Sequence, residues 1–288
     1  MVNFTEELKE KGYCVIDNIL SQDEIDTSLI YFREWVESSE QFKKLHSKVS
    51  PHGIIKHFEV GHQKHAWYIR TREKVQNVFR EIWNTNNLVV SFDGTCWMPI
   101  NQEKHRDTIW THSDQAPNKK GVCCCYQGFV SLTENKERTF VVYEGSHKLY
   151  ENYCEIYNLS HTKNWQKIEP EYLSKIQDKK RILHVKAGSI VIWDSRTFHQ
   201  NQYGNNSIKE ERIVQYVSYL PKKGRSEKMK EKRLKYFNSK RTTSHWAYPV
   251  SVNGLQPQSY GNDELKIDYD SLISPELSEF EDKIYNLI

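Results

Sequence analysis

Short β-rich segments separated by polar stretches fill the chain from residue 88 to residue 220, and this pattern constrains the fold more than any other feature. Several such strands at short spacing are typical of a β-sandwich or a β-barrel. Residues 150–180 are polar and interrupt the strands where an inserted loop or helix would be tolerated. The expected strands are 88–92, 108–114, 122–132, 139–143, 182–185, 189–193 and 213–220.

The first third of the chain is expected to be mainly helical. Ser21 fits a helix N-cap, and Glu24 three residues later completes a capping-box pattern in front of an apolar helical face. A second apolar face at helical spacing follows later, and a short apolar run after Gly12 is typical of a strand. The expected elements are helices at 21–37 and 72–84 and a strand at 13–16.

Length and composition indicate one globular domain. A chain of 288 residues fits one large domain better than two, because β-barrels with helical additions reach this size as one unit. Hydrophobic residues make up 37% of the chain and charged residues 27%, which argues against disorder. We expect a single domain over 1–288, in which a helix-rich N-terminal segment (1–87) packs on a β core (88–221) and a basic segment and tail follow (222–288).

The positive charge is concentrated in one segment. Residues 222–241 hold ten Lys or Arg against Glu227 and Glu231, a local charge of +8 that leaves −5 for the rest of a chain whose net charge is +3. The segment could attract an anionic substrate, but a solvated basic helix is the simpler interpretation. No recognised RNA- or DNA-binding signature accompanies the charges, so we expect no nucleic-acid partner.

Neither a membrane segment nor a disulfide framework is expected. No apolar run approaches the roughly 20 residues that a membrane-spanning helix needs, so we predict a soluble, cytoplasmic protein without a membrane partner. Six cysteines, three of them adjacent at 123–125, show neither a Cys-x-x-Cys pair nor regular spacing. We interpret them as free thiols, because adjacent residues of a strand point to opposite faces and cannot grip one metal together.

A metal site is predicted from two histidines and one carboxylate. If the expected strand 108–114 alternates, then Trp110, His112 and Asp114 share one face. His199 lies soon after the apolar run 189–193 and can supply a third ligand at the end of a strand. Three such ligands leave coordination positions open for a co-substrate and O2, and imidazoles suit iron better than Mg or Ca.

The spacing alone is weak evidence. With 12 His and 12 Asp among 288 residues, a His-x-Asp pair is expected by chance about once in two chains of this composition, and this chain has two. The other pair is His105-Arg-Asp107, in a polar stretch that we interpret as a loop. A kinase interpretation of it fails, because no glycine-rich loop or Asp-Phe-Gly segment accompanies it.

Six motifs in a fixed order add specificity. They are Leu-Val-Val-Ser-Phe-Asp-Gly from residue 88, Trp-Thr-His-Ser-Asp-Gln from residue 110, Gln-Gly-Phe-Val-Ser-Leu from residue 127, Glu-Gly-Ser-His-Lys from residue 144, Gly-Ser-Ile-Val-Ile-Trp-Asp-Ser-Arg-Thr-Phe-His from residue 188, and a final strand that begins at Arg212. In these motifs the chain resembles the phytanoyl-CoA dioxygenase (PhyH) family of non-haem iron oxygenases. The likeness extends over most of the chain, from the segment 12–16 to His245 and Trp246.

The resemblance implies a fold and a set of site residues. The implied fold is mainly β with flanking helices, a double-stranded β-helix or jelly-roll, cupin-like barrel. His112, Asp114 and His199 fall on the iron ligands, and Arg212 falls on the basic residue that holds the distal carboxylate of 2-oxoglutarate. A surface ion pair with a neighbouring glutamate, Glu210 or Glu211, is the alternative for this arginine.

Further positions of the sequence carry weaker expectations. Gln127, Asn201 and either Ser91 or Asp93 match positions where relatives turn polar groups toward the co-substrate, although ordinary strand hydrogen bonding would also explain them. Asp194 and Arg196 are expected to brace the loop that carries His199, since metal-binding histidines usually need a supporting partner. Glu144 to His147 is expected to form a turn, and a ligand role for His147 is disfavoured.

The resemblance implies an Fe(II)- and 2-oxoglutarate-dependent dioxygenase. Such an enzyme uses O2, hydroxylates a substrate and releases succinate and CO2. The presence of Asp114 favours hydroxylation over halogenation, because related halogenases lack the carboxylate ligand. The substrate is expected to be a small molecule or an acyl- or phosphate-bearing compound, and the basic segment 222–241 could attract an anionic one. The alternatives are a jelly-roll binding protein without redox chemistry and a cupin-like metalloenzyme that does not use 2-oxoglutarate.

Overall fold

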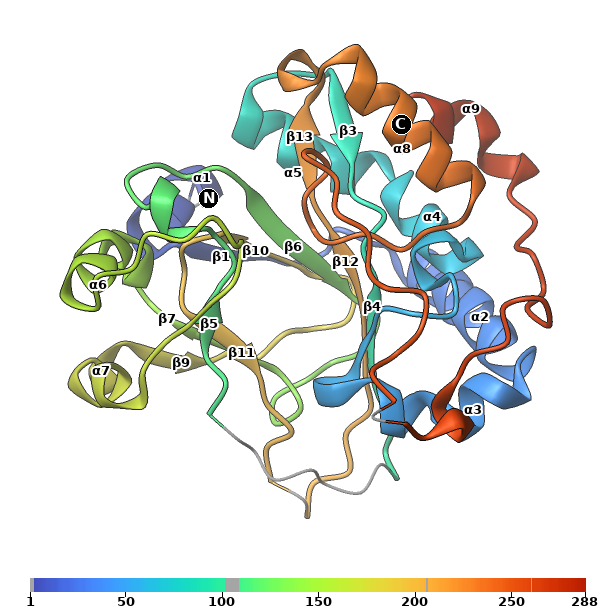
Figure 1. Ribbon diagram of the computed structural model, residues 1–288, viewed down its shortest axis with the longest axis horizontal. Helices are drawn as coiled ribbons and strands as arrows, with labels where there is room; N and C mark the ends of the chain where they lie inside the picture. Colours follow the sequence, from blue (N-terminus) through green and yellow to red (C-terminus); the bar gives the residue numbers. More distant parts are fainter. Residues whose placement is uncertain (1–2, 102–108, 206, 260) are drawn as a thin grey trace. The chain divides into compact units, whose positions relative to one another are not determined.

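The computed structural model describes residues 3–101, 109–205, 207–259 and 261–288 (Figure 1). The chain divides into two compact units. Unit 1 consists of Met1–Asp17 and Met98–Arg212, and unit 2 consists of Asn18–Trp97 and Ile213–Ile288. The prediction of a single domain over 1–288, divided into the segments 1–87, 88–221 and 222–288, stays a prediction.

Unit 1 contains two antiparallel groups of strands. The first has β10 between β1 and β6, and the second has the order β8-β5-β11-β7-β9. The strands β6 and β10 are almost wholly buried, and β10 is accordingly an apolar run over Ile190 to Trp193 rather than an alternating sequence. The strands are β1 (Tyr13–Ile16), β5 (His112–Ser113), β6 (Tyr126–Ser131), β7 (Phe140–Tyr143), β8 (Gln166–Lys167), β9 (Lys180–Ile182), β10 (Ile190–Asp194) and β11 (His199–Asn201).

Three helices accompany these strands in unit 1. They are α1 (Phe4–Lys11), α6 (Tyr150–Ile156) and α7 (Pro170–Lys175). The stretch 150–180, expected as an insertion, folds into α6, β8 and α7, and its aromatic residues form a core of their own with Tyr143 and Phe198. Tyr153 and Tyr172 meet edge to face at 4.9 Å between ring centroids, which joins α6 to α7. The insertion is therefore packed into unit 1.

Unit 2 combines helices with two small groups of strands. The strand order is β12-β4-β2 in one group, and β13 pairs with β3 in the other. The strands are β2 (Ile54–Ile55), β3 (Leu88–Val90), β4 (Thr95–Met98), β12 (Arg212–Val217) and β13 (Tyr219–Pro221), and Met98 and Arg212 are counted with unit 1. The helices are α2 (Gln22–Glu37), α3 (Glu40–Val49), α4 (Lys64–Arg70), α5 (Glu73–Trp83), α8 (Glu227–Asn238) and α9 (Glu281–Tyr285).

Predictions that rest on local signals are confirmed. The capping box at Ser21 and Glu24 starts α2, the helix expected at 72–84 is α5, and the strand expected at 13–16 is β1. The strands expected at 139–143 and 189–193 are β7 and β10 within one residue, and those at 88–92 and 122–132 are shorter, as β3 and β6. All six cysteines are free thiols, although 123–125 precede β6 rather than lie in it.

Three strand predictions are wrong in some of their residues. Residue 108 of the strand expected at 108–114 lies outside the described residues, and residues 109–114 form only the short β5. The backbone groups beside β5 bind outside a regular ladder, because the carbonyl of Thr111 accepts from Ile168 and the N–H of Asp114 donates to Ser195. The strand at 182–185 is displaced to β9, and the strand at 213–220 is interrupted at Ser218, whose carbonyl accepts from Ser91. Among the described residues, the sheets do not close into a barrel. No helix in this part of the chain has the length and apolar character to cross a membrane.

Candidate metal centre

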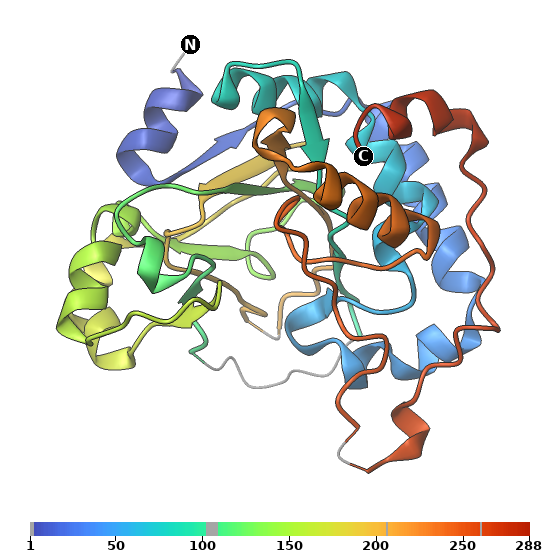
Figure 2. The same cartoon turned by 45° about the horizontal axis from the view of Figure 1, so that its top comes forward.

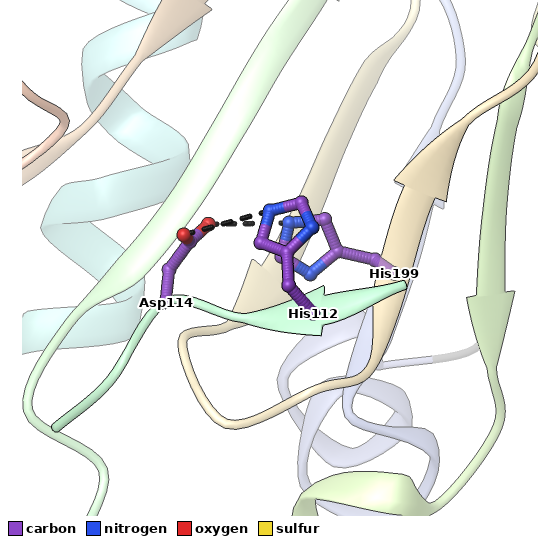
Figure 3. A group of neighbouring side chains, drawn as sticks. All are labelled: His112, Asp114 and His199. Carbon is purple, nitrogen blue, oxygen red and sulfur yellow. Dashed lines mark ion pairs between the residues drawn. The ribbon is translucent and has the colours of Figure 1, made fainter. Parts of the chain in front are cut away.

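His112 and His199 lie opposite each other on paired strands. β5 and β11 are antiparallel neighbours, and His199 is the register partner of His112 (Figure 3). The two side chains lie on the same side of the sheet, because directly opposed residues of an antiparallel pair point to one face. Their imidazole centroids are 4.4 Å apart. Strand pairing thus brings together two histidines that are far apart in the sequence.

Asp114 completes the group from the residue after β5. Its backbone N–H donates to the carbonyl of Ser195 at 2.9 Å, which holds the carboxylate over the two rings. Oδ1 lies 3.6 Å from Nε2 of His112, and Oδ2 lies 3.2 Å from Nε2 of His199 (Figure 3). The three candidate ligand atoms all lie within 4.8 Å of one another, and the three residues are 4–9% exposed.

Both imidazoles are fixed in the same way. Nδ1 of His112 lies 3.1 Å from the carbonyl oxygen of Trp110, and Nδ1 of His199 lies 2.9 Å from that of Thr197. A carbonyl oxygen can only accept, so each Nδ1 carries the proton and donates. In the neutral rings each Nε2 then presents a lone pair toward Asp114. Such backbone support of the second ring nitrogen is typical of metal-binding histidines.

The donor set fits a divalent transition metal. Two Nε2 lone pairs and a carboxylate face one another at short distance in a buried space, and acceptors so placed repel unless a cation or added protons lie between them. Two imidazoles with one carboxylate suit Fe(II) and leave coordination positions open, whereas Mg and Ca prefer oxygen ligands. His112, Asp114 and His199 are therefore the residues that could hold iron.

Gln127 supports the carboxylate of Asp114. The amide Nε2 of this β6 residue donates to Oδ2 of Asp114 at 3.0 Å, and Gln127 is 4% exposed. The sequence predicts that Gln127 faces the co-substrate, and that role stays a prediction. We call His112, Asp114 and His199 the metal group. The amide of Gln127 orients Asp114, the anionic member of this group, as residues behind a metal-binding carboxylate usually do.

The loop from Asp194 to His199 is braced as expected. The guanidinium of Arg196 donates to both carboxylate oxygens of Asp194, at 3.0 and 2.7 Å. A residue that sequence reasoning does not single out adds to this: Gln115 accepts from the hydroxyl of Ser195 at 2.7 Å and donates to the carbonyl of Val122 at 2.7 Å. Its place directly after Asp114 in the Trp-Thr-His-Ser-Asp-Gln motif is the available signal.

Aromatic rings surround the two histidines. Trp110 stacks on His112 with centroids 4.8 Å apart, and Phe140 and Trp193 each lie 5.3 Å from His199. Trp165 also stacks on His112, at 5.8 Å, and sequence reasoning misses it because it lies in the polar stretch 150–180 without any periodic signal. This apolar shell limits the access of water to the ligand atoms, which strengthens electrostatic interactions there.

Arg212 lies buried in the same unit as the triad. It is 1% exposed, and its guanidinium carbon lies 5.1 Å from the ring centroid of Phe129 on β6. Phe129 contacts Trp193, which contacts His199, so aromatic rings connect Arg212 to the metal group. Such burial does not fit a surface ion pair. Glu210 instead accepts the backbone N–H groups of residues 136–138.

The other predicted residues lie in different surroundings. Asn201 is buried on β11 two residues after His199, on the same face, and its carbonyl accepts from the indole of Trp110 at 3.1 Å. Ser91 and Asp93 belong to unit 2, where the carbonyl of Asp93 accepts from Arg70 at 2.6 Å. The ring of His147 lies 2.9 Å from the carbonyl of Lys9 and outside the triad. The pair His105-Arg-Asp107 lies outside the described residues.

The chain is similar to known proteins over most of its length. The family model of phytanoyl-CoA dioxygenase (PhyH) matches residues 8–207. Among curated proteins, Ava biosynthesis cluster protein O of Aspergillus versicolor is 25% identical over 268 residues, which cover 84% of this chain and 85% of that protein.

Two solved structures share the fold. One is the epimerase SnoN in complex with Fe3+, α-ketoglutarate and nogalamycin RO, with a TM-score of 0.53, 16% identity, and 76% of this chain and 82% of that chain covered. The other is EctD from S. alaskensis with bound Fe, with a TM-score of 0.53, 14% identity and 79% of each chain covered. These likenesses confirm the predicted fold class, mainly β and cupin-like with flanking helices, in which the described sheets remain open.

Proposed function

The chain belongs to the phytanoyl-CoA dioxygenase (PhyH) family, and from this premise we propose that it is an Fe(II)- and 2-oxoglutarate-dependent dioxygenase that hydroxylates a small molecule. Membership of the family implies Fe(II), 2-oxoglutarate and O2 as cofactor and co-substrates. The observation that carries the proposal is the buried group of His112, Asp114 and His199, in which two fixed Nε2 lone pairs and one carboxylate face a common point.

Each member of the group has a distinct task in this proposal. The carbonyls of Trp110 and Thr197 hold the imidazoles in the tautomer that binds metal, and Gln127 holds the carboxylate of Asp114 toward them. When bound, Fe(II) with 2-oxoglutarate and O2 supplies the oxidising chemistry that hydroxylates the substrate and yields succinate and CO2. The chain itself contributes the ligand geometry and the exclusion of water.

Arg212 is proposed to anchor the distal carboxylate of 2-oxoglutarate. A guanidinium presents parallel N–H donors that match a carboxylate, and its charge persists when buried. Its burial and its position against Phe129 support this role, because they hold the guanidinium within the apolar interior that also surrounds His199. Asn201 is proposed as a further polar contact of the co-substrate, since it lies on the same strand face as His199.

We propose hydroxylation as the reaction and a small molecule as the substrate. The fold also carries other chemistry, since SnoN is named an epimerase. The carboxylate of Asp114 supports hydroxylation over halogenation. A small-molecule substrate is supported by two names: the curated relative is a biosynthesis cluster protein, and the SnoN complex holds nogalamycin RO.

Anaerobic titration with 2-oxoglutarate tests the proposed function. Protein loaded with Fe(II) should develop the metal-to-ligand absorption band of a chelated keto acid, and should form succinate when air is admitted. The variant Asp114→Ala should lose both signals. His184→Ala is the matched control, because this exposed histidine pairs with Glu134 on the surface and should leave both signals intact.

The opposite result separates the alternatives. Protein that holds iron but shows neither the band nor succinate would be a cupin-like metalloenzyme that does not use 2-oxoglutarate. Protein that retains no metal at all would be a binding protein without redox chemistry. Either outcome would overturn the proposed function.

A further inference from the structure

An aromatic stack leads from the metal group to the protein surface. The ring of His112 stacks on Trp110 at 4.8 Å and 23°, and on Trp165 at 5.8 Å and 28°. His112 is 6% exposed, whereas Trp165 is 38% exposed. The accessible end of the stack is therefore an indole whose neighbour is a candidate iron ligand.

Trp165 is held in place by the segment that carries the metal group. It directly precedes β8, in which Gln166 lies opposite Ser113 and Lys167 lies opposite His112. On its other side, Asn164 accepts from the backbone N–H of Ala116 at 3.0 Å. Because the chain is tied to the segment 112–116 on both sides of Trp165, the indole has a fixed position relative to the metal group. A preorganised ring loses little entropy when it binds a ligand.

The exposure of Trp165 is unusual among the tryptophans of the chain. All eight tryptophans lie among the described residues, and Trp165 is the one among them that is exposed. Trp110, the other indole that stacks on His112, is instead half-buried and donates its indole N–H to the carbonyl of Asn201. A single exposed apolar side chain needs no explanation by itself. A large planar ring fixed beside a catalytic metal group is a surface on which a substrate can stack.

A cation lies over the exposed ring, on an exposed and flexible side chain. The ammonium of Lys163 is 5.5 Å from the ring centroid of Trp165. Among the described residues no carboxylate lies within ion-pair distance of this ammonium, while other exposed lysines of unit 1, such as Lys148 and Lys175, do have carboxylate partners. The charge of Lys163 is therefore available to an anionic group of a molecule on the indole.

We propose that Trp165 and Lys163 form a substrate-binding subsite for a flat ring compound that carries an acidic group. The indole stacks against the ring, and the ammonium of Lys163 contacts the acidic group. The subsite rests on the proposed function, because the indole that would bind the ring stacks directly on His112, a candidate iron ligand.

Binding of a simple planar acid tests the subsite. The probe is 2-naphthoate, measured by anaerobic calorimetry on protein loaded with Fe(II) and 2-oxoglutarate, so that the co-substrate already occupies the open metal positions. Trp165→Ala should weaken binding by about five- to tenfold, and Trp165→Phe, which keeps a ring, by no more than about threefold. Lys163→Gln should lower the affinity for 2-naphthoate to that for the uncharged 2-naphthamide.

Three controls make the outcome decisive. Ile156→Ala removes an exposed apolar side chain from the nearby helix α6 and should not change probe binding. The saturated decahydro-2-naphthoate, which has the charge without the flat ring, should bind more weakly than 2-naphthoate. The 2-oxoglutarate absorption band is recorded on each sample before the probe is added.

The results separate the two proposals. If wild-type protein shows the band but does not bind 2-naphthoate, or if Trp165→Ala binds it as the wild type does, the subsite is wrong while the proposed function stands. Equal affinity for the saturated acid would also overturn the subsite. If wild-type protein shows no band, the proposed function itself fails.

Discussion

At the residue scale, the two candidate metal-binding histidines are held in place in the same way. Each donates its Nδ1 proton to the carbonyl oxygen two residues before it, those of Trp110 and Thr197. The motifs allow the candidate ligands to be predicted. They do not allow these Nδ1 hydrogen bonds to be predicted, because the direction of a carbonyl group depends on the path of the folded backbone. The role of Gln127 behind Asp114 is hidden for the same reason, since it depends on an amide reaching across from β6.

The proposed role of Arg212 gives a prediction at this scale. Arg212→Lys keeps the positive charge but loses the paired donors that match a carboxylate, so the dissociation constant for 2-oxoglutarate should rise about tenfold. Affinity for Fe(II) should stay unchanged, because Arg212 is not among the candidate ligands. Both constants can be measured in one experiment, by metal titration followed by the absorption band.

A second buried arginine of unit 1 is the matched control. Arg138 is 5% exposed, and its guanidinium donates to the carbonyls of Pro99 and Ile100. Arg138→Lys should lower stability without a specific effect on 2-oxoglutarate. If both variants shift the dissociation constant equally, or if Arg212→Lys shifts nothing, Arg212 does not hold the co-substrate.

At the element scale, the bounds of the two expected helices could be predicted better than those of several strands. The boundaries of α2 and α5 follow from a capping box and from apolar spacing, which are local signals. The short β5 depends on partners far along the chain, and no local pattern distinguishes its two residues from the rest of 108–114. The contribution of β8 could not be predicted either, because Gln166 and Lys167 are polar and pair at a sheet edge.

The pairing of β8 with β5 gives a prediction at this scale. The backbone N–H of Ile168 donates to the carbonyl of Thr111 at 2.9 Å, next to the register pair of His112 and Lys167. Ile168→Pro removes this donor and should lower both the free energy of unfolding, by about 3 kcal/mol, and the affinity for Fe(II) several-fold. Chemical unfolding and anaerobic metal titration measure the two effects.

The variant Ile168→Ala separates the backbone effect from the packing effect. Ile168 is fully buried, so alanine leaves a cavity and also destabilises unit 1 by about 2 kcal/mol or more. It keeps the N–H, however, and should retain the affinity for Fe(II). Equal loss of iron from both variants would mean that β8 acts by packing alone.

At the scale of the whole molecule, the basic segment 222–241 holds unit 2 together. The buried Arg233 of α8 donates to the carbonyl oxygens of Val90, Ala247, Leu287 and Ile288. Arg241 donates to the carbonyl of Asn253, and in Figures 1 and 2 the segment that follows α8 runs along the helices of unit 2. Two of the basic side chains that suggested an anionic partner, Arg233 and Arg241, thus form hydrogen bonds to backbone carbonyls within unit 2.

Unit 2 also buries three histidines, and they make its stability depend on pH. Burial lowers the pKa of His46 to about 4 and the pKa values of His62 and His65 to about 3, the last two helped by the nearby charge of Arg70. All three are at most 2% exposed, and the Nδ1 atom of each is buried without a hydrogen-bond partner. The folded unit therefore holds them neutral.

We expect the protein to lose stability as the pH falls from 7 to 5. The unfolded chain protonates these histidines near pH 6.5, whereas the folded chain does so only near pH 3 to 4, so the unfolded state binds more protons throughout this window. Stability is fully present above pH 6.5 and declines below it, by about 2 kcal/mol per histidine at pH 5. Urea unfolding of metal-free protein measures the loss without a contribution from metal release. His65→Gln should recover about 2 kcal/mol of it at pH 5, whereas His184→Ala, at an exposed position, should recover none. A free energy of unfolding equal at pH 7 and pH 5 would show that these buried rings are charged in the folded protein.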